Sequence, residues 1–307
     1  MKNKKAYGYL ALVATSFFWG TTWVASKLGV MEMPAMQMAY IRQFLGGISL
    51  VGFFMLYKKF PLPTAKQFQW LIMMSVLMFV FANGLSTWSL HWISSGLSAL
   101  IGALYPLCVV ILERLFFKSK PLNKLAYIGL FLGLAGVGIV FYENAIVSTG
   151  NGIWMGVGLS LLAMLSWSLG TIFMVRNKAH INPYYGAGWQ MLLSSIILFA
   201  WAESSLHTVP FSNISSKAWM VILYLVAIGS IVAFVAFIYS MKTLPAALAS
   251  LYAYINPLVA MLLGSLLVNE ELTIHILWGS VVTLTGVYLV NMSMRKTSKK
   301  IITEPEM

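Results

Sequence analysis

The stretch WSLHWISSGLSALIGALYPL, residues 88–107, aligns without a gap with YSMKTLPAALASLYAYINPL, residues 239–258. The two stretches share a serine at their second position, two leucines near the middle and a Pro-Leu pair at the end. Further out, with small gaps, Trp19 falls opposite Trp167. The sequence therefore predicts two copies of one unit, which meet near residue 147.

The composition places both copies in a membrane. The chain has 60% hydrophobic and 9% charged residues and a mean hydropathy of +0.83, whereas soluble proteins carry about 25% charged residues. Apolar runs of about 20 residues, long enough to span a bilayer as a helix, recur throughout. We predict an all-α polytopic membrane protein with ten transmembrane helices, at residues 7–28, 36–57, 68–90, 93–117, 125–142, 152–175, 184–201, 219–241, 246–268 and 274–292.

The positions of the basic residues predict the orientation of these helices. Ten spans place both termini on one side of the membrane. If that side is the cytoplasm, all but three of the 20 Lys and Arg residues fall in cytoplasmic segments, as the positive-inside rule requires. The three on the outer side are Lys27, Arg42 and Lys217. Both termini are therefore predicted to be cytoplasmic.

An odd number of helices per copy makes the repeat inverted, since the second copy then enters the membrane from the opposite side. We predict a first five-helix unit at residues 1–146, a second, inverted unit at 147–294 and a disordered cytoplasmic tail at 295–307. Inverted repeats are common in secondary transporters, whose substrate site lies near the midplane between the two units.

Two prolines interrupt predicted helices at equivalent positions, Pro106 and Pro257. Each removes one backbone hydrogen bond and crowds the carbonyl group four residues earlier. At membrane depth such a carbonyl group needs a protein or water partner. Two interpretations stay open, namely a packing kink and a hinge beside a cavity lined by Tyr105 and Asn256.

The first predicted helix carries a polar and aromatic face formed, at spacings of three and four, by Ser16, Trp19, Gly20, Trp23 and Lys27. A charged side chain in a membrane normally faces a partner or a wet cavity. Lys27 either reaches the outer surface or forms the charged end of an aromatic-walled pocket. Arg42 enters the second helix from the same side, and the two cations leave room for an anionic guest such as a carboxylate.

The predicted substrate-binding residues are Trp19, Trp23, Lys27, Arg42, Asn83, Tyr105, Trp167, Tyr239, Tyr252 and Asn256, with Pro106 and Pro257 as hinges. No metal and no cofactor is predicted, because the chain has no aspartate and only one cysteine, Cys108, in an apolar run. The expected partners are a small-molecule substrate and the lipid bilayer. Nucleic acid is not expected despite the net charge of +12, because the charges cluster in short loops. A monomer and a homodimer both stay open.

Several motifs together resemble those of the drug/metabolite transporter superfamily, specifically proteins with two EamA-type domains. The motifs occur in the family's order: Trp19-Gly20 followed by Lys27, then Arg42, then LYAYINPL at 251–258, then Asn269-Glu270, Leu272-Thr273, Gly279 and Gly286. The resemblance covers about residues 7–293. It implies alternating-access transport of small metabolites, often export of amino acids or related compounds across the bacterial inner membrane.

The repeat fails at one acidic position, where Lys120 of the first copy aligns with Glu270 of the second. A symmetric role for this carboxylate is therefore not expected. Glu113, beside Arg114, is interpreted as forming a local ion pair or reaching toward the cytoplasm. A proton is one alternative for the coupling ion, with Glu113 or Glu270 as its acceptor.

The sequence argues against a membrane enzyme and against an ATP-driven pump. It lacks an HExxH zinc motif, paired aspartates and a phosphate-binding GxxxxGK[ST] loop. We predict that the chain is not an enzyme but a secondary transporter in the inner membrane, which exports an amphipathic, carboxylate-bearing solute such as a large neutral or aromatic amino acid. A channel-like facilitator is the main alternative, and an intramembrane enzyme is the weaker one.

Overall fold

The computed structural model describes residues 2–117, 123–147, 152–176, 179–244 and 251–303. Over these residues the chain is helical and contains no strand, which confirms the predicted all-α class. The helices of the first half are α1 Lys2–Glu32, α2 Ala35–Gly52, η1 Phe53–Tyr57, α3 Ala65–Ser75, η2 Val76–Gly84, α4 Leu85–Ser89, α5 Ser95–Gly102, α6 Tyr105–Phe117 and α7 Lys124–Val147. Those of the second half are α8 Ile153–Val175, α9 Pro183–Ser204, η3 Phe211–Asn213, α10 Ser216–Tyr224, η4 Leu225–Val232, α11 Ala233–Thr243, α13 Tyr252–Val268 and α14 Ile274–Thr303.

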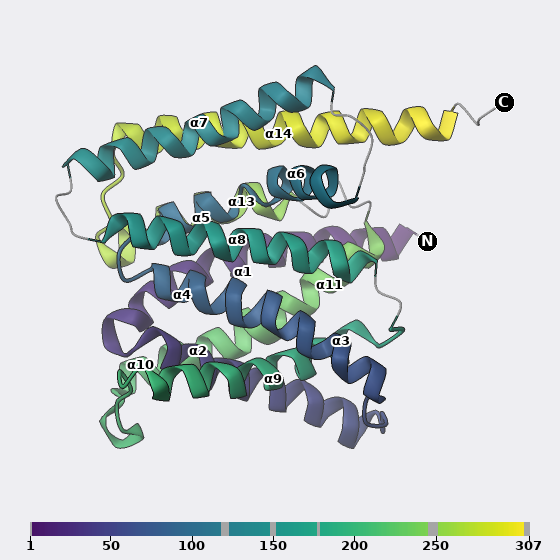
Figure 1. Cartoon of the computed structure of the whole chain (residues 1–307), viewed down its shortest axis with the longest axis vertical. Helices are drawn as coiled ribbons and strands as arrows, with labels where there is room; N and C mark the ends of the chain where they lie inside the picture. Colours follow the sequence, from purple (N-terminus) through teal and green to yellow (C-terminus); the bar gives the residue numbers. More distant parts are fainter. Residues whose placement is uncertain (1, 118–122, 148–151, 177–178, 245–250, 304–307) are drawn as a thin grey trace.

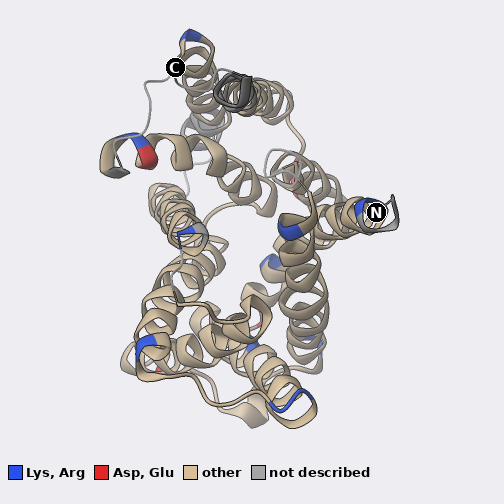
Figure 2. Ribbon diagram, turned by 90° about the vertical axis from the view of Figure 1, so that its right-hand side faces the viewer, with Lys and Arg blue, Asp and Glu red and all other residues tan. Residues whose placement is uncertain are grey.

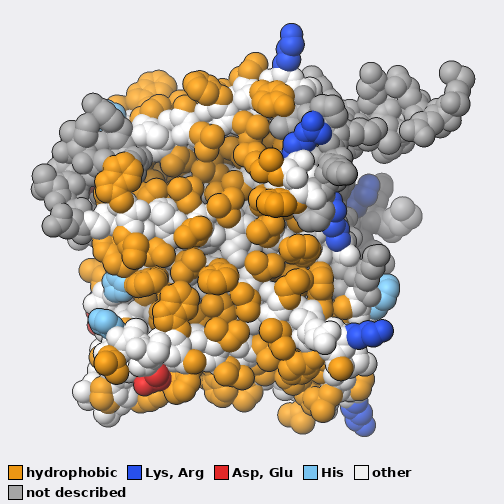
Figure 3. Space-filling model, viewed as in Figure 1, with side chains coloured by type: hydrophobic (Ala, Val, Ile, Leu, Met, Phe, Trp, Pro, Cys, Tyr) orange, Lys and Arg blue, Asp and Glu red, His pale blue; other side chains and the backbone are white. Residues whose placement is uncertain are grey.

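Six helical stretches are long and apolar enough to cross a membrane: Ala35–Tyr57, Ala65–Ser89, Ser95–Phe116, Ile153–Met174, Ser216–Thr243 and Ile274–Ser293. Two further apolar helices, Lys124–Val140 and Tyr252–Val268, are shorter. The face of the molecule in Figure 3 is almost continuously hydrophobic, and Lys and Arg side chains gather along its right-hand edge. An apolar band bordered by positive charge is typical of a protein embedded in a bilayer.

The helices run roughly parallel or antiparallel to one another, and two tight pairs lie at opposite ends of the bundle (Figure 1). At one end α7 packs along α14, and at the other α2 packs along α9. The first pair is close because both helices present glycine: a Cβ atom on Gly129 would lie 2.6 Å from Gly286 O. Small residues let helix backbones approach in this way. The remaining long helices fill the space between the two pairs.

The third and eighth predicted helices each contain a π-helical segment in their middle. In the first half η2 joins α3 to α4, and in the second half η4 joins α10 to α11. The register that aligns residues 88–107 with 239–258 makes these two segments overlap. Since π-helical turns widen a helix locally and occur frequently at functional sites, both segments are candidates for part of a functional site.

The two mid-helix prolines differ in their effect on the backbone. Before Pro106 the helix breaks, because α5 ends at Gly102 and a tight turn, in which Leu104 N donates to Ile101 O at 3.0 Å, leads into α6. Pro106 then occupies the first turn of α6, where its missing N–H is not needed. Pro257, by contrast, lies inside the continuous helix α13.

Both ends of the described chain lie on the same side of the bundle. The start of α1 and the end of α14 point to the right in Figure 1, and Figure 2 looks onto that side. Helix α14 continues past Arg295 to Thr303, into the segment predicted to be a disordered tail. The physical reason is that no glycine or proline follows Gly286 until Pro305.

Candidate functional site

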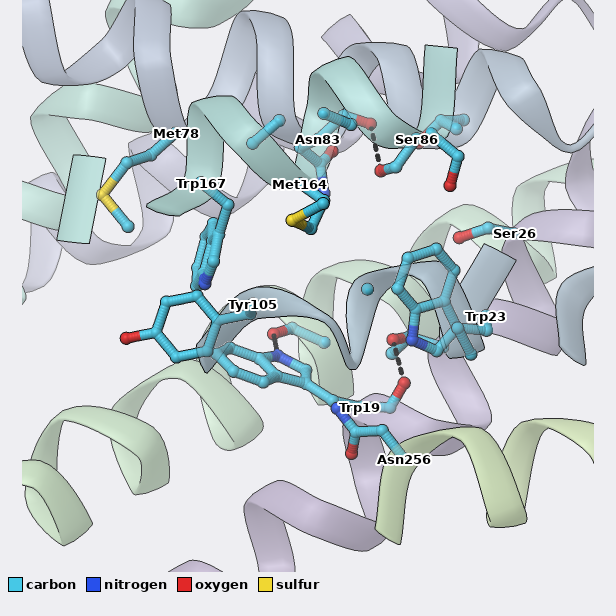
Figure 4. A pocket seen from close by; sticks show the side chains of 18 of the residues that line it. Trp19, Trp23, Ser26, Met78, Asn83, Ser86, Tyr105, Met164, Trp167 and Asn256 are labelled. Carbon is cyan, nitrogen blue, oxygen red and sulfur yellow. Dashed lines mark hydrogen bonds between the residues drawn. The ribbon is translucent and has the colours of Figure 1, made fainter. Parts of the chain in front are cut away.

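A cavity of about 160 Å³ lies between helices of both halves of the chain (Figure 4). A buried water needs about 10–15 Å³ of such space, so the cavity can hold a solute of about ten non-hydrogen atoms. Its lining comes from α1, α2, η2, α4, α5, α6, α8, α9, η4, α11 and α13, together with Leu90 and Ala103. Among the described lining residues, none belongs to α7 or α14.

Most of the predicted substrate-binding side chains meet around this cavity. Those that line it are Trp19, Trp23, Arg42, Asn83, Tyr105, Trp167, Tyr252 and Asn256. Lys27 and Tyr239 are not among the described lining residues, and neither are Pro106 and Pro257. Trp19 and Trp167 approach each other from opposite halves of the chain in Figure 4.

Trp19 is the centre of an aromatic cluster at one end of the cavity. Its ring centroid lies 5.9 Å from that of Trp167 at an interplanar angle of 83°, 5.3 Å from that of Tyr252 and 4.9 Å from that of Phe237. The indole N–H of Trp19 donates to Gly229 O at 3.3 Å. Edge-to-face contacts and a satisfied N–H hold this partly buried tryptophan in one orientation. The cluster therefore gives the cavity a rigid apolar wall.

Arg42 brings a positive charge into this apolar setting. Its side chain is only 8% exposed, and its Nε donates to Ser230 Oγ at 3.0 Å. A Cβ atom on the neighbouring Gly229 would lie 2.9 Å from Arg42 Nη2. The guanidinium group thus lies against the π-helical segment η4, at a point where only glycine leaves room for it.

No carboxylate among the described residues forms an ion pair with Arg42. The ion pairs between described residues join Glu113 to Arg176 and Glu32 to Lys217, and no described residue lining the cavity is acidic. A buried cation without an ion partner is costly. Arg42 is therefore the strongest indication of where an anionic ligand would bind.

Sequence reasoning did not select Ser230, Gly229 or Phe234, although all three line the cavity. Gly229 and Ser230 do have a sequence signal, because they form a Gly-Ser pair within the aliphatic run LVAIGSIVAF, residues 225–234. Small and polar residues in such a run mark a close approach or a wet face. Their contact with Arg42 joins elements far apart in the sequence, so helical periodicity does not reveal it.

A polar wall faces the aromatic cluster. Asn83 Oδ1 accepts a hydrogen bond from Gln43 Nε2 at 2.8 Å, and Ser86 Oγ donates to Asn83 O at 3.0 Å. Behind them, the hydroxyl oxygens of Ser98 and Ser160 lie 3.1 Å apart. The lining thus offers neutral hydrogen-bonding groups on one side and rings on the other.

Lys27 lies outside the cavity lining, where it holds the turn at residues 90–95. Its Nζ donates to Leu90 O at 2.6 Å and to Ile93 O at 3.1 Å. From the other half of the chain, Glu270 accepts hydrogen bonds from Ser95 N at 2.7 Å and from Ser95 Oγ at 2.8 Å. A carboxylate at a helix N-terminus is stabilised by the unpaired N–H groups there, so Glu270 caps α5.

A second hollow lies beyond Phe234, which lines both cavities. Its other lining residues come mainly from α3, α9 and α11 and include Trp70, Gln190 and Ile238. In the register that pairs Trp19 with Trp167, Gln190 is the counterpart of Arg42. The two halves therefore place a charged and a neutral side chain in equivalent positions, each beside its own cavity.

A helical bundle with a cavity between two halves is an arrangement that membrane transporters use. Comparison with known proteins makes the class specific. Residues 6–142 and 154–292 each match the EamA-like transporter family, so the chain belongs to this family, and the resemblance predicted from the motifs is confirmed.

The relatives are named as transporters, and their matches span most of both chains. The chain is 32% identical over 268 residues to the uncharacterized inner membrane transporter YedA of Escherichia coli (strain K12), covering 86% of this chain and 83% of YedA. It is 23% identical over 280 residues to the uncharacterized transporter YoaV of Bacillus subtilis (strain 168), covering 91% and 95%. Together with the apolar helices, these relatives identify a multi-pass protein of the bacterial inner membrane.

The fold also matches a solved protein structure. The TM-score is 0.64 with 16% sequence identity, and the match covers 95% of this chain and 99% of the other. At this identity the match shows that the two proteins share a fold.

Proposed function

We propose that this protein is a secondary transporter that moves a small, amphipathic, carboxylate-bearing solute through the central cavity by alternating access. The observation that carries the proposal is the buried guanidinium group of Arg42, which faces an aromatic cavity without a protein carboxylate among the described lining residues. The solute class proposed first is the large neutral and aromatic amino acids, and the proposed direction is export.

The membrane arrangement proposed for this function is ten spans in two inverted copies, with both termini in the cytoplasm. Four observations support it: the two separate family matches, the equivalent π-helical segments η2 and η4, the Trp19–Trp167 contact, and the common side of the two chain ends. In such a repeat the substrate site lies between the copies, and the cavity has lining residues from both.

Alternating access would carry the solute between the Arg42 side and the Gln190 side of Phe234. Supporting this path, the two cavities share Phe234 as a lining residue. The break before Pro106 is the proposed hinge of the first copy, with Pro257 as its counterpart in the second. Glu113 and Glu270 are not among the described lining residues, so the cavity lends no support to proton coupling through either.

Counterflow in proteoliposomes tests the proposal. Liposomes loaded with amino acids, organic acids, sugars, nucleosides or quaternary amines would be diluted into trace radiolabelled solute of the same kind. We expect saturable uptake, accelerated by the internal solute, for carboxylate-bearing solutes. Uptake that neither saturates nor responds to internal solute would indicate a channel, and uptake equal to that of empty liposomes for every class would contradict transport.

A further inference from the structure

The charge balance of the cavity narrows the class of solute further. Among the described lining residues Arg42 is the only one with a formal charge at neutral pH, and no histidine or glutamate is present. Three glutamates bind other groups away from the cavity lining. Glu32 and Glu113 form ion pairs, and Glu270 caps α5. The cavity therefore offers one positive charge and no negative one.

The guanidinium group of Arg42 has N–H donors that can bind a ligand. A guanidinium group carries five N–H donors in a planar fork, and the hydrogen bond recorded for Arg42 uses only Nε, to Ser230 Oγ. Neither terminal nitrogen has a hydrogen-bond partner among the described residues. A carboxylate can accept two parallel hydrogen bonds from such a fork, which is among the strongest polar contacts in proteins.

An ammonium group would find no equivalent partner. Asn83 Oδ1 already accepts a hydrogen bond from Gln43, and the Thr22 and Ser86 hydroxyl groups donate to carbonyl groups of their own helices. What remains is neutral, namely lone pairs of the lining hydroxyl groups and of the Asn83 and Asn256 amide oxygens, and the faces of the aromatic rings, where a cation gains about 0.5–2 kcal/mol. Burying an ammonium group without a charged partner costs more than such contacts return.

We infer that the cavity selects a monoanionic carboxylate with an aromatic or bulky apolar body, and that an α-amino group contributes nothing to recognition. The inference rests on the proposed transport function and replaces the zwitterionic amino acids named first there with carboxylate solutes that carry a net negative charge. Arg42, oriented by Ser230, holds the carboxylate. The apolar body lies against Trp19, Trp167 and Tyr252.

Three compounds with one carbon skeleton separate the charge types: 3-phenylpropanoate, phenylalanine and phenethylamine. Their binding to the purified full-length protein in lipid nanodiscs would be measured by calorimetric titration at pH 7.5. We expect 3-phenylpropanoate to bind at least about tenfold more tightly than phenylalanine, and phenethylamine to show no saturable binding. Tighter binding of phenylalanine than of 3-phenylpropanoate, or saturable binding of phenethylamine, would overturn the inference, and so would the absence of binding by all three.

Variants assign the effect to Arg42. Arg42→Gln should lose binding of 3-phenylpropanoate, and Arg42→Lys should weaken it, because lysine keeps the charge but not the fork. Lys217→Gln, which removes an outer-surface cation paired with Glu32, is the matched control and should bind normally. Saturable counterflow of another solute class, without binding of the three compounds, would contradict this inference but support the transport function. Absence of counterflow for every solute class would contradict the transport function itself.

Discussion

Arg42 Nε lies 3.0 Å from Ser230 Oγ, in a contact that joins the first half of the chain to the second. Arg42 belongs to α2, and Ser230 belongs to the π-helical segment η4. The orientation of the buried cation thus depends on how the two halves are packed together. A movement of one half against the other would move the charge or release it.

Replacing Ser230 tests this positioning role. Ser230→Ala removes the acceptor for Arg42 Nε, so the guanidinium group should be less well oriented and the affinity for carboxylate solutes should fall about 3- to 10-fold, as expected for a hydrogen bond of about 1 kcal/mol. Titration of the purified variant measures the dissociation constant. The matched control is Ser240→Ala, because Ser240 is also buried but donates to Phe237 O of its own helix, away from the cavity. An unchanged affinity in Ser230→Ala would show that Ser230 does not position Arg42.

Glu270 should stabilise the end of the bundle that contains the turn at residues 90–95. Glu270→Gln weakens its hydrogen bonds to Ser95, which are charge-assisted, and should lower the apparent free energy of unfolding by about 1–3 kcal/mol. Thermal unfolding in one detergent, compared at equal protein concentration, gives the readout. The neighbouring Glu271→Gln removes the same charge from an exposed position and should change the midpoint little. Equal midpoints for the two variants would mean that the cap on α5 contributes nothing.

His91 reports on the position of Lys27. Burial, and secondarily the charge of Lys27, lowers the pKa of His91 from its ordinary value of 6.5. Its neutral form is therefore favoured in the folded protein, and the stability it contributes is present above pH 6.5 and is lost as the pH falls through the lower folded pKa. Lys27→Met should raise the pKa of His91 toward 6.5, measured by NMR with His91→Gln used for assignment. A pKa that does not move would place the Lys27 ammonium group away from the 90–95 turn.

Two glycines in α7 should differ in their tolerance of a larger side chain. A Cβ atom on Gly136 would lie 2.5 Å from Gly279 O of α14 and closer still to Thr283, whereas a Cβ atom on Gly138 would meet nothing within 4 Å. Gly136→Val should therefore destabilise the protein by about 1–3 kcal/mol through overpacking, and Gly138→Val should stay within about 0.5 kcal/mol of wild type. Thermal unfolding compares them, and similar losses in both variants would contradict the observed α7–α14 packing.

The fold and much of the cavity lining could be predicted from the sequence, because both depend on local patterns. Apolar runs predicted an all-helical chain, which the described residues show, and six of their helical stretches are long and apolar enough to cross a membrane. The gapless match of residues 88–107 with 239–258, extended to Trp19 and Trp167, pointed to side chains that do meet around the cavity.

What local patterns cannot show is which distant groups a side chain reaches. Lys27 shares a helix face with Trp19 and Trp23, so its spacing predicted a place in the cavity. Its long side chain extends instead to the carbonyl groups of Leu90 and Ile93, more than sixty residues away. The contact of Arg42 with Ser230 is of the same kind and depends on a π-helical segment that helical periodicity does not predict.

The most direct test of the account is counterflow of radiolabelled 3-phenylpropanoate or phenylalanine into proteoliposomes that contain wild-type protein or Arg42→Gln. Incorporation would be matched by protein content, and Lys217→Gln would serve as the control. The account predicts saturable, internally stimulated uptake by wild type and Lys217→Gln, and uptake near the empty-liposome level for Arg42→Gln. Equal saturable uptake by wild type and Arg42→Gln would contradict it, because the buried guanidinium group would then have no part in holding the transported solute.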